Sequence, residues 1–134
     1  MVVCDPGDEA VGALNEFVRS QRLEAAQISA VGAFERATVG WFDPAAKRYR
    51  PIPVDEQCEL LSLMGDVAMG EDGPILHMHA ALGLSDGTTR GGHLLEGRVN
   101  PTLEAIVTET PAQLRKVMHP DIGLALIDLD QSQA

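Results

Sequence analysis

Residues 75–83 read ILHMHAALG, and their alternation decides how this part of the chain folds. Apolar residues alternate with two histidines, His77 and His79, at the two-residue period of a β-strand. Side chains alternate between the two faces of a strand, so both histidines project from one face and the intervening apolar residues pack on the other. The stretch therefore predicts a strand that presents two imidazoles on one side.

A third histidine, His93, ends the segment LSDGTTRGGH, residues 84–93. Asp86-Gly87 is a strong turn signal and predicts that the chain folds back in a hairpin centred near Gly87. In that register His93 lies opposite Ala81, diagonal to His79 and on the same face. Three imidazoles on one sheet face are a ligand set for a metal such as zinc, with a fourth position left for water or another ligand. The alternative is that the histidines make only structural hydrogen bonds.

Other residues near these histidines are weaker candidates. Side chains alternate along a strand, and Glu96 is an odd number of residues after His93, so it is expected to point away from the histidine face. It is therefore not expected to orient an imidazole unless a bulge intervenes. Asp86 is better explained as a turn residue. His119 precedes a proline in a polar turn and is not expected to be a ligand. The expected metal ligands are therefore His77, His79 and His93 alone, and no residue is identified as catalytic.

The segment CELLSLMGDVAM, residues 58–69, reads as a strand with apolar residues on both faces. Such a strand must be covered on both sides. One helix covers only one face of a sheet, so we expect a homo-oligomer in which a partner subunit covers the other face. Glu59 interrupts the apolar run, and a carboxylate there is costly unless it is paired. We expect it to meet Arg90, Arg98 or a polar group across an interface.

The remaining segments predict one main helix and a set of strands joined largely by hairpins. The helix is capped by Asp5 or Asp8, runs to about Arg22 and has its apolar residues at three-and-four spacing. These apolar residues are Val11, Leu14, Phe17 and Val18. The main strands are expected at residues 27–34, 37–42, 47–54, 58–69, 75–83, 91–99 and 102–109, with shorter ones at 1–4 and 123–130, an irregularity at Gly32, and Pro51 and Pro53 marking a sheet edge. The fold class is α+β, a mostly antiparallel β-sheet of about seven strands packed with one main α-helix.

Length and composition restrict the class of protein. The 134 residues predict one domain, residues 1–134, and the 45% hydrophobic and 22% charged content is typical of a soluble globular protein. The net charge of −10, without a basic run, argues against direct nucleic-acid binding. No apolar run is long enough for a membrane span and the start lacks signal-peptide features, so a cytoplasmic protein is expected. Cys4 and Cys58 lack a motif spacing, and no disulfide is expected.

The order of segments resembles the plants-and-prokaryotes conserved (PPC) domain. The matching pieces are SAVGAFERATVGWFDP, CELLSLMGDVA, ILHMHAALG and GGHLLEGRVNPTLEAIVTE. The resemblance implies an antiparallel sheet packed on a helix, a homotrimer, and zinc as the ion held by the three histidines. Members from plants carry AT-hook motifs that bind DNA, and stand-alone bacterial members are described as DNA-binding by similarity.

This chain departs from that family in three respects. It carries no AT-hook core Arg-Gly-Arg-Pro, and Gln57-Cys58-Glu59 stands where the family has Arg-x-Glu. The segment before the helix is also short, which shortens the first strand. Three roles stay open at this point: a trimeric zinc module with an open metal position, whose status as an enzyme is uncertain; a DNA-associated or transcription-related interaction module without metal chemistry; and histidines that only stabilise the trimer. A concave, water-accessible metal position would favour chemistry or binding of a small ligand or anion.

Overall fold

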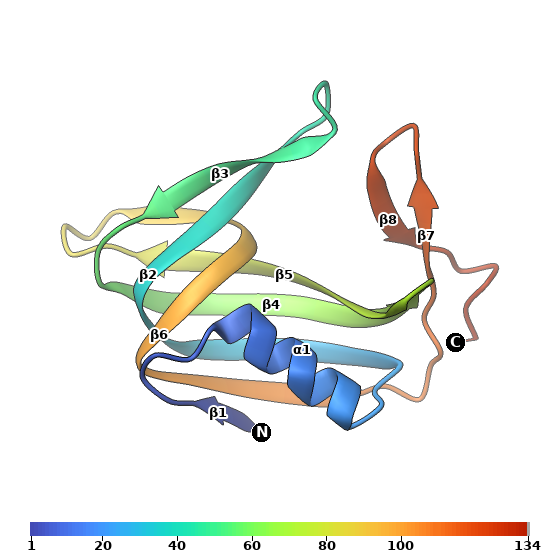
Figure 1. Ribbon diagram of the computed structural model, residues 1–134, viewed down its shortest axis with the longest axis horizontal. Coiled ribbons are helices and arrows are strands. Elements are labelled where there is room, and N and C mark those ends of the chain that lie inside the picture. The colour runs from blue at the N-terminus through green and yellow to red at the C-terminus, as the bar shows by residue number, and fades with distance from the viewer. Residues whose placement is uncertain (134) are drawn as a thin grey trace.

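The structure, a computed structural model, describes residues 1–133 and is built mainly of long antiparallel strands (Figure 1). In chain order the elements are β1 (Val2–Cys4), α1 (Ala10–Ser20), β2 (Ala25–Asp43), β3 (Arg48–Val54), β4 (Cys58–Gly70), β5 (Gly73–Gly83), β6 (Thr89–Glu109), β7 (Lys116–His119) and β8 (Leu124–Ile127). The predicted α+β class with a mostly antiparallel sheet and one helix is confirmed for this part of the chain. No helix among the described residues has both the length and the apolarity needed to cross a bilayer.

Six strands form the main sheet, in the order β1-β6-β5-β4-β2-β3, and β6 also pairs with β2. The strands β2, β4, β5 and β6 therefore close a ring of antiparallel pairings around the core. β3 lies at the edge, as its two prolines predict. β7 and β8 form a separate two-stranded hairpin, which stands apart from the helix in Figure 1. The sequence predicted a strand near β8 but not β7.

Two strands are longer than predicted. β2 and β6 are continuous where the sequence suggested two strands each, and register shifts along both absorb the interruptions. One such irregularity was expected at Gly32, whose φ of +154° and close approach to Thr102 explain the glycine: a Cβ there would clash with the Thr102 carbonyl oxygen. Long strands that bend at such shifts can pair with different neighbours at their two ends.

The helix packs its predicted stripe into the core. Leu14 and Val18 are fully buried, and Val11 and Phe17 are partly buried against the same cluster. The predicted cap was wrong: the Glu9 carboxylate, not that of Asp5 or Asp8, accepts hydrogen bonds from the backbone N–H groups of Val11 (3.2 Å) and Gly12 (2.7 Å). The helix ends at Ser20, two residues before the predicted limit, because Arg22 takes a left-handed conformation, φ 56°.

β4 is apolar on two faces, as predicted, but a bulge decides which leucines are buried. The register on β5 shifts between Leu60 and Ser62, so that Leu60 and Leu63 both reach the core. Leu61 and Met64 stay exposed on the opposite side. Glu59 is exposed and forms no ion pair within residues 1–133, so the predicted pairing with Arg90 or Arg98 within the chain was wrong, while a polar partner across an interface stays a prediction. An exposed carboxylate needs no partner because water solvates it.

The two cysteines, Cys4 and Cys58, are free and buried. The absence of a disulfide between them agrees with the prediction. Both act as small apolar core residues.

Candidate metal centre

β5 and β6 bring the three predicted histidines together on one face. His77 and His79 lie on β5, and His93 of β6 stands directly opposite His79. The predicted register was wrong by two residues, since Ala81 pairs with Gly91 rather than with His93. The turn is centred one residue earlier than expected, because the Leu84 N–H donates to the Thr88 carbonyl at 2.9 Å. An even shift leaves the face unchanged, so the predicted cluster forms.

The ring nitrogens of this cluster converge. One nitrogen from each of His77, His79 and His93 lies within 4.8 Å of the others. The Nε2 atoms of His77 and His79 are 3.1 Å apart. Two nitrogens bound to one tetrahedral zinc would be separated by roughly 3.3 Å, given Zn–N bonds of about 2.0–2.1 Å. The spacing of this pair therefore fits a shared metal ion.

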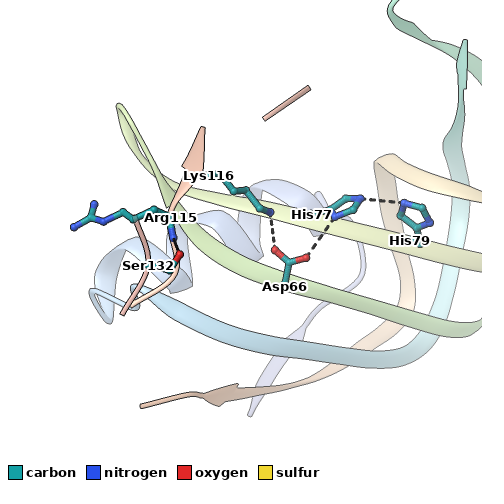
Figure 2. A network of polar contacts seen from close by, with 6 residues as sticks. All are labelled: Asp66, His77, His79, Arg115, Lys116 and Ser132. Atoms are coloured by element: carbon teal, nitrogen blue, oxygen red, sulfur yellow. Dashed lines mark hydrogen bonds and ion pairs between the residues drawn. The ribbon is translucent and has the colours of Figure 1, made fainter. Parts of the chain in front are cut away.

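A carboxylate that the sequence reasoning missed orients one of the histidines. Asp66 of β4 stands directly opposite His77, and its Oδ2 lies 3.4 Å from His77 Nδ1 (Figure 2). A carboxylate on one imidazole nitrogen directs the other toward the metal and raises the basicity of the ligand. His77 Nε2 is the nitrogen that faces His79, so the geometry matches this arrangement.

Lys116, the first residue of β7, fixes Asp66 in turn. Its Nζ donates to Asp66 Oδ1 at 2.6 Å, and its side chain is only 3% exposed. Figure 2 shows the resulting chain of contacts from Lys116 through Asp66 and His77 to His79. A buried lysine is stable here because its charge is paired with the carboxylate. The hairpin that carries Lys116 is thus tied to the histidine cluster.

His93 is the most buried of the three histidines. Its ring stacks on Tyr49 of β3, with centroids 4.4 Å apart, and its Nδ1 is buried without a hydrogen-bond partner among the described residues 1–133. Burial lowers the pKa of His93 to about 4, and the charges of His77, His79 and Lys116 act in the same direction. Burial, followed by the charge of His77, also lowers the pKa of His79. These two imidazoles are therefore neutral at pH 7, which is the form that binds a metal.

The residues present fit a zinc ion. They supply three imidazole nitrogens on one side, a carboxylate behind one of them, and a buried ring nitrogen without a hydrogen-bond partner among residues 1–133. A three-histidine set with a fourth position open to solvent or ligand is typical of zinc sites that bind further molecules.

The remaining candidates lie outside the cluster. Glu96 accepts a hydrogen bond from the Thr38 hydroxyl at 2.8 Å and is not in the histidine cluster. The parity on which its prediction rested is interrupted, because the pairing of β2 with β6 shifts between Thr38 and Val39. Asp86 accepts from the backbone and hydroxyl of Thr88, which confirms its role in the turn. His119 ends β7 and is not among the clustered histidines, in agreement with the prediction.

A comparison with known protein families gives a match that includes the histidine-bearing strands. The sequence pattern of the Plants and Prokaryotes Conserved domain matches residues 1–111. The chain belongs to this family. The matched range contains all three histidines and Asp66, whereas Lys116 lies beyond it.

Individual relatives cover almost the whole chain. A candidate DNA-binding protein from Bacteroides thetaiotaomicron superposes with a TM-score of 0.92 at 29% identity, covering 96% of this chain and 90% of the other. A metal-containing protein from Archaeoglobus fulgidus superposes with a TM-score of 0.84 at 32% identity, covering 94% and 89%. The bifunctional protein GlmU of Synechococcus is 31% identical over 125 residues. That match takes in 92% of this chain but only 19% of the relative's length.

Proposed function

We propose that this chain is a zinc-binding protein in which His77, His79 and His93 hold the ion and leave one position open. The observation that carries the proposal is the convergence of three imidazole nitrogens within 4.8 Å. The Asp66 carboxylate behind His77 supports it. The relative from Archaeoglobus fulgidus, which is a metal-containing protein, supports the same assignment.

Elemental analysis of untagged protein tests this proposal. We expect about one zinc per chain, lost in His77→Ala and in His93→Ala because two imidazoles hold the ion poorly. His119→Ala is the matched control, since it removes a histidine outside the cluster, and it keeps the zinc. Protein that contains no metal and takes up none from added zinc would exclude the site.

We also propose that the domain, residues 1–134, assembles as a homotrimer. Four large apolar side chains are more than half exposed on neighbouring strands of one face. They are Val31 of β2, Leu61 and Met64 of β4, and Ile106 of β6, and they line one shallow hollow together with Ser29 and Glu104. A patch of this kind on a folded chain is a typical association surface. Sedimentation at low micromolar concentration should give three times the chain mass of 14.3 kDa.

A DNA-associated interaction module is the alternative function, and the relative from Bacteroides thetaiotaomicron favours it. The charge of −10 opposes direct contact with phosphates. The densest basic group, Lys47, Arg48 and Arg50, is partly neutralised, because Arg50 lies 3.4 Å from Asp43. We expect no mobility shift of duplex DNA by the chain alone at physiological salt. A shift whose affinity falls with added salt would establish direct binding instead.

A further inference from the structure

A cavity of about 370 Å³ opens beside the histidine cluster. His77 and His93 line its polar end together with Asp66, Lys116 and Tyr49. This volume lies within the range of about 300–1,000 Å³ in which proteins bind small molecules. The cavity is therefore large enough for a molecule that also reaches the open metal position.

The rest of the lining is apolar and comes from β5 and the C-terminal hairpin. Ile75 and Leu76 line one side. The other side consists of all four residues of β8, Leu124, Ala125, Leu126 and Ile127. This β8 wall lies beyond residues 1–111, the range shared with the family pattern. The three histidines therefore lie within the range that matches the family pattern, whereas the β8 wall lies in a segment outside that range.

Two contacts tie the hairpin to β4, the strand that pairs with β5. The Met69 N–H of β4 donates to the Leu114 carbonyl at 2.8 Å, just before β7 begins. Lys116 pairs with Asp66, which itself contacts His77. The wall is therefore held at a defined position relative to the histidines, as a pre-formed binding site requires.

The charge at the polar end favours an anion. The three imidazoles are uncharged as ligands, so they leave both charges of a zinc ion uncompensated. The nearby Asp66 carboxylate does not compensate them, because it is already paired with Lys116 at 2.6 Å. A negatively charged group at the open position gains Coulomb energy, whereas an ammonium group would be repelled.

We propose that this cavity binds small carboxylates with an apolar body, the carboxylate on the open metal position and the body along the β8 wall. The inference rests on the proposed zinc site. It assigns ligand selection to the C-terminal hairpin. Because each methylene removed from water adds affinity, the length of the apolar body determines how tightly a carboxylate binds.

Calorimetric titration of zinc-loaded, untagged protein tests the ligand class. The three probes are acetate, n-hexanoate and n-hexylammonium, which separate the head group from the body. We expect hexanoate to bind about tenfold or more tightly than acetate, since only its body reaches the β8 wall. Hexylammonium, whose alkyl body is slightly longer than that of hexanoate and whose charge is opposite, should not bind measurably.

A wall variant tests the location. Ala125→Trp places a large ring in the cavity and should weaken hexanoate binding about tenfold or more while zinc content and acetate binding stay unchanged. Ala45→Trp, in the exposed turn between β2 and β3, is the matched control and should bind hexanoate normally. The comparison of acetate with hexanoate uses wild-type protein and so does not depend on how well Ala125→Trp folds.

The outcomes separate this inference from the zinc proposal. Zinc-loaded protein that binds hexanoate no better than acetate, or that binds hexylammonium equally well, would overturn the carboxylate inference and leave the zinc site standing. Hexanoate binding unaffected in a folded Ala125→Trp protein would overturn the β8 wall as the site. Protein that takes up no zinc would overturn both.

Discussion

At the residue scale, the Asp66 carboxylate should decide how well the histidines of the proposed site hold a metal. It lies 3.4 Å from His77 Nδ1 and is itself fixed by Lys116, so the imidazole ring has one preferred orientation. Without the carboxylate, the ring could rotate and its basicity would fall. The Lys116 charge would then also lack its partner in a nearly closed environment.

We therefore expect Asp66→Asn to weaken zinc binding by about 10- to 100-fold. The amide keeps the size of the side chain but removes the charge that orients His77. Competition with a chromophoric chelator at pH 7 measures the change. Asp121→Asn, at an exposed position of the β7–β8 turn, is the control and should bind zinc like the wild type. Equal affinities for all three proteins would show that Asp66 has no part in the site.

The buried imidazole of His93 should make the metal-free protein sensitive to acid. Its pKa is about 4 in the folded state and about 6.5 when unfolded, so the unfolded chain gains the proton first as the pH falls. Stability is therefore complete above pH 6.5 and is lost progressively between about pH 6.5 and 4. Because the ring is only half-buried, we expect a loss of roughly 1–2 kcal/mol in the free energy of unfolding, less than the full shift implies.

Urea unfolding at pH 7 and pH 4.5, in the presence of a chelator, measures this effect. His93→Gln removes the titrating group and should reduce the difference between the two pH values relative to wild type. A difference that is the same in both proteins would assign the acid sensitivity to other groups.

At the element scale, helix α1 depends on a cap that also reaches the sheet. The Glu9 carboxylate accepts hydrogen bonds from Val11 and Gly12 at the helix start and from the Gly97 N–H of β6 at 3.1 Å. One side chain thus satisfies helix N–H groups and joins the helix to the longest strand. A cap that also holds tertiary structure should matter more than an isolated one.

We expect Glu9→Ala to lower the free energy of unfolding by about 1–2 kcal/mol, since it leaves these N–H groups without their acceptor. Thermal and urea unfolding of the purified protein would show the loss. Glu16→Ala, an exposed position on the same helix, is the control and should change stability by less than about 0.5 kcal/mol. A cap variant as stable as wild type would mean that water replaces the carboxylate at no cost.

The elements show which features the sequence could predict. The alternation in residues 75–83 places His77 and His79 on one face, and the even number of positions from these residues to His93 places His93 there too. The predicted register was wrong by two residues, but an even error does not change the face. Asp66 could also have been found, since the short turn between Gly70 and Gly73 sets the register that pairs it with His77. Tyr49 and Lys116 reach the cluster from β3 and from the separate hairpin, and no local pattern specifies those tertiary contacts. The bulge in β4 could not be predicted either, because no local pattern in the sequence specifies it.

At the scale of the whole molecule, the two apolar surfaces lie on different parts of the structure. The patch formed by Val31, Leu61, Met64 and Ile106 lies across β2, β4 and β6, and Ser29 of β2 pairs with both Met64 and Ile106. It therefore forms one continuous surface of the main sheet. The β8 wall is on the separate hairpin and faces the cavity with the histidines. Assembly and ligand binding should consequently be separable by mutation.

A charge in the main-sheet patch should dissociate the proposed trimer without removing zinc. We expect Met64→Glu to sediment as a monomer, because a carboxylate buried in an apolar interface without a partner is strongly unfavourable. Met118→Glu is the matched control: Met118 is 59% exposed and Met64 60%, but Met118 lies on β7 outside the patch. That variant should remain trimeric. Sedimentation velocity combined with zinc analysis of both variants measures the two properties together. A Met64→Glu protein that stays trimeric would place the interface elsewhere, and one that loses both the trimer and its zinc would show that the metal centre is complete only in the assembly.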